Sequence, residues 1–462
     1  MLFNSLEFII FFPLVTILYF LLPHKFRWIH LLFASCIFYA AFIPQYLLIL
    51  FFLIVIDYTA GLLIERKQHK KLWLILSIVA NISLLGSFKY YDFFISNVYG
   101  LTGSHFILLK WILPIGLSFH TFQSMSYTIE VYRGRQEAIR HAGYYALYVM
   151  FYPQLVAGPI ERPQKLLPQL FQRQQFSSQK LYEGLRLMAW GFFKKLVIAD
   201  RVGQYADAVF NNPGHASTLP IWLAVFFFSI QIYADFSGYS DIAIGAARCM
   251  GIDLSINFNR PYRAQNIKEF WKRWHISLSS WFRDYIYIPL GGNRKGMLRK
   301  NINLLLTFIL SAIWHGAGWT FIVWGFLHGV FALIYDGSKK YFTKLPGLIA
   351  LMVTAACVGF AWIFFRAASI SNAMEIISRG MNLNDLSLRI AIPGVKIEFG
   401  NFTLALSVCM IAYMFIIEKF TTPKLFDLNS KKIIDTVMFS VTLLLIIFFG
   451  VFQKSSFIYF QF

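Results

Sequence analysis

The sequence predicts an all-α polytopic membrane protein, and three observations lead to that class. The apolar set (Ala, Val, Ile, Leu, Met, Phe, Trp, Tyr, Cys) makes up 58% of the 462 residues, and charged residues make up only 14%. Soluble domains carry roughly 45–50% apolar and about 25% charged residues, so a soluble fold could not keep this much apolar surface from water. The mean hydropathy is +0.58, and the apolar runs are continuous rather than alternating, which argues against an outer-membrane barrel.

Eleven apolar runs reach or approach the length of about 20 residues that a helix needs to cross the hydrocarbon. Shorter runs can still cross where the protein thins the bilayer, so we expect roughly ten to twelve crossings. The first run is expected to be a retained span and not a cleavable signal peptide, because no Lys or Arg precedes it. The runs lie near residues 8–22, 28–43, 46–64, 72–88, 107–127, 219–234, 303–316, 319–335, 347–365, 401–417 and 433–452.

The organisation expected from these runs is one integral membrane domain over residues 1–462. Residues 1–130 supply N-terminal spans, residues 131–300 a re-entrant and interfacial core, and residues 301–462 further spans and a C-terminal tail. Three prolines and a glycine fall between residues 153 and 163, near apparent membrane depth. Irregular backbone is tolerated there only inside protein or beside a water-filled cavity, so we expect the active chamber in this core. Residues 181–202 mix apolar side chains with Lys and Arg and are expected to be interfacial.

The net charge of +20 arises from 42 Lys and Arg against 22 Asp and Glu. The basic residues punctuate apolar runs, so anionic lipid headgroups and the positive-inside rule explain them better than nucleic acid does. With an outside N-terminus, the inner loops hold twenty Lys and Arg and the outer loops hold six, which also places the C-terminus outside. The four cysteines form no CxxC pair, and no disulfide or metal site is expected.

The first polar cluster at apparent membrane depth is QIYADFSGYSDIAIG, residues 231–245, which contains Asp235 and Asp241. Ionisable residues in a membrane interior cost free energy, and they are therefore candidates for a functional role. A proton or ion path is one interpretation. Polar ties between helices at a broken helix are the other, and paired carboxylates alone do not separate the two.

The second cluster is residues 257–292, and the helical spacing of its aromatic residues between 270 and 285 predicts an amphipathic helix that lies in an interface. Its aromatic stripe includes Trp271 and Trp274. Lys268, Lys272, Arg273 and Arg283 fall off that stripe, and the basic face that they form could hold the phosphates of an anionic cofactor.

Three histidines in the second half of the chain are candidate site residues. His315 follows Trp314 at the end of an apolar run and has no charged neighbour for many residues on either side. Burial there would keep its ring neutral and able to accept a proton, although a satisfied core histidine is the alternative. His275 lies at the edge of the amphipathic stripe, where a half-buried structural histidine is the default interpretation. His328, in WGFLHGV, is a weaker candidate.

The motif WKRWHISLSSWFRDYIYIPLGG, which contains His275, precedes SAIWHGAGWTFIVWG, which contains His315, by about forty residues. In this order the sequence resembles the membrane-bound O-acyltransferase superfamily, and most of all its bacterial branch that modifies alginate, peptidoglycan or teichoic acid. The resemblance covers most of the chain. Further motifs that carry it are FHTFQSMSYTIEVYRG (119–134), FYPQLVAGPIERP (151–163), FSGYSDIAIG (236–245) and NFNRPYRAQNIKEFW (257–271).

The resemblance implies a ring of tilted helices around a thin centre, with a tunnel that reaches the histidine from both faces. The marked histidines of the family would fall on His275 and His315, the latter being the catalytic candidate. The implied activity is transfer of an acyl group from a cytoplasmic thioester to a hydroxyl of an exported polysaccharide, across the bacterial inner membrane. The expected donor is acetyl-CoA. The implied partner is a periplasmic protein of the SGNH-hydrolase type, and no bound cofactor is implied.

The C-terminal residues KSSFIYFQF resemble the FxYF ending of a small peptide that partners the D-alanylation member of the superfamily. There the tyrosine is proposed to carry the acyl group, so Tyr459 is a candidate acyl relay here. A phenol ester is more reactive than an alkyl ester because the phenol pKa is near 10. An aromatic anchor at the membrane interface is the alternative.

Two other functional classes remain open from the sequence. A lipid-linked saccharide transporter or flippase would suit the length, the spans and the intramembrane carboxylates, although no repeat symmetry between the halves is evident. A catalytically inactive scaffold is disfavoured because both histidines are present.

Overall fold

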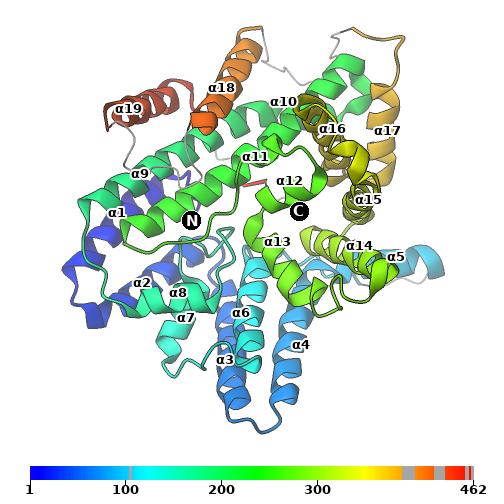
Figure 1. Ribbon diagram of the computed structural model, residues 1–462. Helices are drawn as coiled ribbons and strands as arrows, with labels where there is room; N and C mark the ends of the chain where they lie inside the picture. The colour runs from blue at the N-terminus through cyan, green and yellow to red at the C-terminus, as the bar shows by residue number, and fades with distance from the viewer. Residues whose placement is uncertain (104–106, 388–400, 421–431, 453–456, 459–462) are drawn as a thin grey trace. The chain divides into compact units, whose positions relative to one another are not determined.

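A computed structural model describes most of the chain, and the described residues are helical with no β-strand among them (Figure 1). The all-α class is therefore confirmed. The described residues are 1–103, 107–387, 401–420, 432–452 and 457–458.

These residues form two compact units, each made of two stretches of chain. The first unit comprises Met1–Ala189 and Tyr239–Ser255, and the second comprises Trp190–Gly238 and Ile256–Phe462. The long helix α11, Thr218–Cys249, passes from the second unit into the first.

The first unit contains helices α1 to α8, most of α9 and the end of α11, with α1 to α6 coloured blue to cyan in Figure 1. Their bounds are α1 Leu6–Leu21, α2 His24–Ala40, α3 Tyr46–Glu65, α4 Lys70–Lys89, α5 Tyr91–Thr102, α6 Leu117–Tyr132, α7 Ala142–Met150, α8 Pro163–Phe171 and α9 Ser178–Phe192.

Helices α3, α4 and α6 pack side by side around a buried polar contact (Figure 1). Asp57 of α3 accepts hydrogen bonds from the Ser77 hydroxyl at 2.6 Å and from the Asn81 amide at 2.9 Å, both on α4. Gly61 lets α3 approach α6, because a Cβ at that position would lie 2.6 Å from the Tyr127 ring. These hydrogen bonds satisfy the buried Asp57 carboxyl without a cation. Because the donors come from α4, the contact holds α3 and α4 together.

The irregular segment 151–160 follows α7, and all ten of its residues are buried. Its backbone is therefore enclosed by protein, which is the condition for irregular structure in a membrane protein.

The second unit contains the remaining helices, including two short π-helical segments, η1 and η4. Their bounds are η1 Phe193–Ala199, α10 Asp200–Asn211, η2 Pro213–His215, η3 Pro261–Arg263, α12 Ile267–Arg273, α13 Ile276–Phe282, η4 Arg283–Tyr287, α14 Gly296–His315, α15 Trp319–Phe342, α16 Gly347–Arg366, α17 Ile370–Gly380, α18 Asn401–Phe420 and α19 Lys432–Phe449.

Helices α14 and α15 form the hairpin that carries two of the candidate histidines. Gly325 of α15 permits their close approach, because a Cβ there would lie 2.4 Å from the Ala312 side chain and 2.6 Å from the Phe308 carbonyl oxygen. Gly316 ends α14, and a Cβ there would overlap the Phe321 ring at 2.1 Å. The turn therefore requires glycine at position 316, and the contact between the two helices requires glycine at position 325.

Seven helices within the described residues are long and apolar enough to cross a membrane, and two shorter apolar helices accompany them. The chain is accordingly a multi-pass membrane protein, although fewer spans meet this length than the ten to twelve crossings expected. The seven are Tyr46–Glu65, Lys70–Lys89, Thr218–Cys249, Gly296–His315, Trp319–Phe342, Gly347–Arg366 and Phe402–Lys419, and the shorter pair are Leu6–Leu21 and Thr436–Phe449.

One expected span is wrong. The run 107–127 is not a single helix, because residues 107–116 are non-helical and α6 begins only at Leu117. Pro114 and Gly116 explain the break, since proline lacks an N–H and disfavours a helical residue before it, and Gly116 has a φ of +78°.

One of the two interpretations of residues 231–245 involved a broken helix, and that break is absent because α11 runs unbroken from Thr218 to Cys249. Gly238 lies in its interior, where a Cβ would meet the Gly191 carbonyl oxygen at 2.7 Å. The glycine therefore serves a close approach of backbone and does not interrupt the helix.

Candidate active site

His315 is the last residue of α14 and is buried. Its Nδ1–H donates to the Ser311 carbonyl oxygen one turn earlier, at 2.7 Å. A carbonyl can only accept, so the neutral ring carries its proton on Nδ1 and its lone pair on Nε2. The rings of Trp314 and Trp324 approach edge-on, each with centroids 4.9 Å from His315, and Phe365 lies at 5.7 Å. An imidazole held in this tautomer among aromatic rings can accept a proton at Nε2.

His275 stands between α12 and α13 with a left-handed backbone, φ 42° and ψ 56°. Its side chain is 0% exposed. Nδ1 lies 3.0 Å from Oδ1 of Asn257. The orientation of that amide is set by Ser277, whose backbone N–H and hydroxyl both donate to the same oxygen at 3.3 and 2.9 Å. The imidazole Nδ1 is therefore a donor too, and the lone pair of the neutral ring is again on Nε2.

The electrostatic setting of His275 keeps its ring neutral. Burial lowers its pKa well below the ordinary histidine value, and a proton taken up by nearby His315 would lower that pKa further. Trp314 connects the two residues, since its ring neighbours that of His315 and lies 6.3 Å from that of His275. The structure therefore brings the two histidines of the sequence motifs into one site, and the half-buried position expected for His275 is wrong.

The single amphipathic helix expected across residues 270–285, within the cluster 257–292, is likewise wrong. The segment begins as extended chain and then forms α12, α13 and η4, with the break at Trp274 and His275. The break is held by two backbone hydrogen bonds, from Asn259 N–H to the Arg273 carbonyl at 2.9 Å and from Ile276 N–H to the Asn257 carbonyl at 2.8 Å. The helical pattern persists across this turn, which is why periodicity did not reveal it.

His328 of α15 is the third histidine of the site and is 0% exposed. Its Nδ1 accepts a hydrogen bond from the Trp271 indole N–H at 3.2 Å. Its ring lies 5.2 Å from Trp324, the residue that also packs on His315. The weaker sequence candidate therefore belongs to the same aromatic enclosure.

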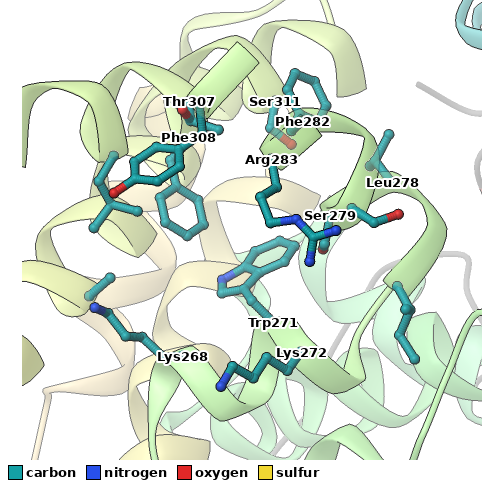
Figure 2. A pocket seen from close by; sticks show the side chains of 15 residues that line it. Lys268, Trp271, Lys272, Leu278, Ser279, Phe282, Arg283, Thr307, Phe308 and Ser311 are labelled. Atoms are coloured by element: carbon teal, nitrogen blue, oxygen red, sulfur yellow. The ribbon is translucent and has the colours of Figure 1, made fainter. Parts of the chain in front are cut away.

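A cavity of about 430 Å³ opens beside these residues (Figure 2). Lys268, Lys272 and Arg283 supply positive charge to its lining, and Ser311, whose carbonyl orients His315, forms part of its wall. The remaining lining residues are mostly apolar or small: Trp271, Ile276, Leu278, Ser279, Ser280, Phe282, Tyr287, Leu304, Thr307, Phe308 and Ala332. The cavity can accept an extended anionic molecule whose apolar part reaches toward α14.

The other residues of the basic cluster have different surroundings. Arg273 does not line this cavity. Its guanidinium donates to Glu269 of the same helix at 2.7 Å. Trp274 is buried in the core, stacked on Phe270 at 5.4 Å and near Trp362 at 5.2 Å. Their assignment to donor binding stays a prediction.

Asp235 belongs to a buried ion cluster in the second unit. Lys195 of η1 lies 2.8 Å from both Asp235 and Asp200. Burial alone would lower the pKa of Lys195, but the two carboxylates outweigh it and raise that pKa. Residues 181–202 are therefore partly buried rather than interfacial at the lysines, because these charges are paired. Asp241 lies further along α11 in the first unit and is half-buried.

Asp235 also accepts a hydrogen bond from the backbone N–H of Ile458, at 2.6 Å. Phe457 packs against Phe236 with ring centroids 5.5 Å apart, and Phe236 lies edge-on to His275 at 4.6 Å. A short stretch near the C-terminus is thus anchored beside the histidine site. Tyr459, the relay candidate, lies outside the described residues.

Fold and site define a helical, multi-pass membrane protein with a histidine centre beside a basic-lined cavity. Residues 110–374, which contain all three histidines, match the model of MBOAT, the membrane-bound O-acyltransferase family. The chain belongs to this family and is an O-acyltransferase.

The chain is also similar to three named relatives. It is 39% identical to the peptidoglycan O-acetyltransferase of Helicobacter pylori, over 78% of this chain and 74% of the relative. It is 39% identical to the probable alginate O-acetylase AlgI of Azotobacter vinelandii, over 84% and 79%. It is 29% identical to the teichoic acid D-alanyltransferase of Bacillus subtilis, over 54% and 68%.

Proposed function

We propose that this chain is an inner-membrane O-acetyltransferase that moves an acetyl group from cytoplasmic acetyl-CoA to a hydroxyl of an extracytoplasmic polysaccharide. The names of two relatives support acetyl as the group and peptidoglycan or alginate as the kind of polymer. The observation that carries the mechanism is the tautomer of His315, whose Nδ1–H is bound to the Ser311 carbonyl so that Nε2 holds the lone pair.

In the proposed reaction, His315 Nε2 takes the proton of the acceptor hydroxyl. The oxygen of that hydroxyl attacks the carbonyl carbon of the thioester. The carbon–oxygen bond forms, the tetrahedral oxyanion collapses, and the carbon–sulfur bond breaks. The proton passes from His315 to the departing thiolate, so the histidine is regenerated. General-base catalysis of this kind contributes roughly 10²–10⁴-fold to a rate. His275, neutral and fixed by Asn257, orients the donor in this scheme.

The cavity supports an anionic thioester as the donor. Lys268, Lys272 and Arg283 face phosphates in this proposal, while the apolar wall that reaches Ser311 takes the acyl-bearing arm. Lys268 is also paired with Asp336, which binds Lys300 at 2.7 Å. That carboxylate holds two lysines near the lining in place before a donor arrives.

Tyr459 is proposed as the relay that carries the acetyl group from the site to a periplasmic partner of the SGNH-hydrolase type. The anchoring of its neighbour Ile458 to Asp235, and of Phe457 to Phe236, supports this role. An ester on a phenol transfers its acyl group readily because the phenolate is a good leaving group. With a tethered carrier the first transfer would be effectively intramolecular.

Replacing Tyr459 with phenylalanine tests the relay. We expect Tyr459→Phe to abolish polymer acetylation while the protein accumulates normally, because the aromatic ring is kept and only the hydroxyl is lost. The measurement is the O-acetyl ester content of the exported polymer. Full acetylation in this variant would make Tyr459 an interfacial anchor and the partner the first acceptor.

The charge of the loops predicts that residues 65–71 and 293–300 face the cytoplasm. Single cysteines placed there in intact cells should resist a membrane-impermeant thiol reagent and react once the cells are opened. Rapid labelling of either loop from outside would reverse the orientation and the direction of transfer.

Polymer chemistry separates acetyl transfer from the alternative, a lipid-linked saccharide transporter or flippase. A strain without this chain should export its polymer in normal amount but without O-acetyl esters. Loss of export itself would favour the transporter. Purified protein that releases CoA from acetyl-CoA only in the presence of the acceptor would add direct support.

A further inference from the structure

The hydrogen bond between Trp271 and His328 links the wall of the cavity to the core of the site. The indole N–H donates to His328 Nδ1 at 3.2 Å, and the two rings meet edge-on with centroids 5.0 Å apart. An indole N–H can only donate, so the neutral His328 carries its own proton on Nε2. The bond joins α12 to α15, two helices more than fifty residues apart in the chain.

Trp271 is half-buried and packs against other aromatic rings. Its ring lies 5.4 Å from Phe308 and 5.8 Å from Trp324, in addition to His328. It also lines the cavity, as do Lys268 and Lys272 from the same short helix (Figure 2). The indole is therefore one wall of the space that would receive the donor, and His328 accepts its only hydrogen-bond donor group.

We propose that His328 is a positioning residue for the donor: it fixes the Trp271 indole as a wall of the cavity and thereby sets the affinity for an acyl thioester. This inference rests on the proposed function. Without an acceptor, the partly buried indole N–H would lose its partner, and the ring would gain alternative rotamers that narrow or open the cavity.

A purely structural role makes a different prediction. Trp271 lies four residues before His275, so a loosened α12 would disturb that histidine and lower kcat. A role in shaping the donor cavity instead raises KM for the donor and leaves kcat nearly unchanged. The division between KM and kcat therefore separates the two.

The kinetic test compares substitutions of His328 in the full-length protein in lipid nanodiscs, with acetyl-CoA as the donor. His328→Leu removes the acceptor, while His328→Asn keeps a side-chain oxygen near the place of Nδ1. We expect His328→Leu to raise KM for acetyl-CoA about fivefold to tenfold, the order of one lost hydrogen bond. His328→Asn should restore KM to within about twofold of the wild-type value.

Trp271→Phe is the matched variant on the other side of the bond, because it keeps an aromatic wall without the N–H. It should raise KM to a similar extent, and the double variant Trp271→Phe with His328→Leu should be no worse than either single variant, since one interaction is shared. Additive effects, a fall in kcat at constant KM, or failure of His328→Asn to rescue would each overturn the inference.

A second measurement does not depend on the donor. Thr307, which lines the cavity from α14, is replaced by cysteine in a variant without the native cysteines. Its reaction rate with a neutral thiol reagent should change at least about fivefold on adding His328→Leu, because the wall moves, and should not change with His328→Asn. Equal rates in all backgrounds would show that His328 does not hold the indole. If acetyl-CoA supports no transfer by the wild type, the proposed donor fails, whereas this labelling result still decides the role of His328.

Discussion

Replacing His315 with alanine should reduce acyl transfer by roughly 10²–10⁴-fold, the usual contribution of a general base. The ring is held by the Ser311 carbonyl in the tautomer that leaves the lone pair on Nε2, and the rings of Trp314 and Trp324 pack edge-on against it. Within the described residues, His275 and His328 are the other imidazoles of the enclosure, and each is already tied through Nδ1 to Asn257 or Trp271. The measurement is the O-acetyl content of polymer from cells that carry only the variant.

His275→Ala is the matched comparison for this experiment. Its imidazole is placed to orient the donor, so we expect a smaller loss of activity than for His315→Ala and a larger change in KM. Both variants should insert and accumulate, because each removes a neutral ring from an enclosure with other aromatic contacts. Normal acetylation with His315→Ala, together with an inactive His275→Ala, would reverse the two roles.

Replacing Lys195 with methionine should destabilise the protein by about 3–5 kcal/mol, the cost of breaking a buried ion pair by removing one partner. Methionine has a similar length, but it leaves the carboxylates of Asp200 and Asp235 buried without the amine that lies 2.8 Å from each. The measurement is the unfolding temperature of the purified protein in detergent and its yield from membranes.

Two further variants make this test specific. Lys194→Met removes the adjacent lysine, which donates to the Ser237 hydroxyl at 3.0 Å, and should cost much less. Adding Asp200→Asn and Asp235→Asn to Lys195→Met removes the uncompensated charge and should restore part of the stability. Equal unfolding temperatures for the two lysine variants would contradict the ion cluster as a source of stability.

The sequence predicted the helical membrane fold well because continuous apolar runs report directly on burial in lipid. The predictions from sequence were wrong where a proline and a glycine break an apolar run, and where a charged side chain is buried with a partner. Because of Pro114 and Gly116, α6 begins only at Leu117, although the apolar stretch begins about ten residues earlier. Lys195 suggested an interfacial segment, but its partner Asp235 lies forty residues later, and only tertiary structure shows that the lysine is paired.

The candidate site was predictable in part. His315 and His275 drew attention because ionisable groups are costly in an apolar setting. Asn257 was missed, since an asparagine eighteen residues before His275 has no pattern of its own, and its role depends on the turn at Ser277. Lys268 and Arg273 belong to the same predicted basic face, but only Lys268 lines the cavity, and nothing in the sequence indicates which cations of that face do so.

The left-handed backbone of His275 has a consequence for how this site can change over generations. At φ 42°, a β-branched or bulky residue is strained, whereas glycine, asparagine and aspartate enter this region readily. A lineage that no longer needs the imidazole can keep the turn between α12 and α13 only by drifting within that small set. Asparagine, with a side-chain amide of its own, is the replacement that keeps both the turn and a hydrogen-bonding group. The backbone conformation at position 275 therefore limits which residues can replace the histidine.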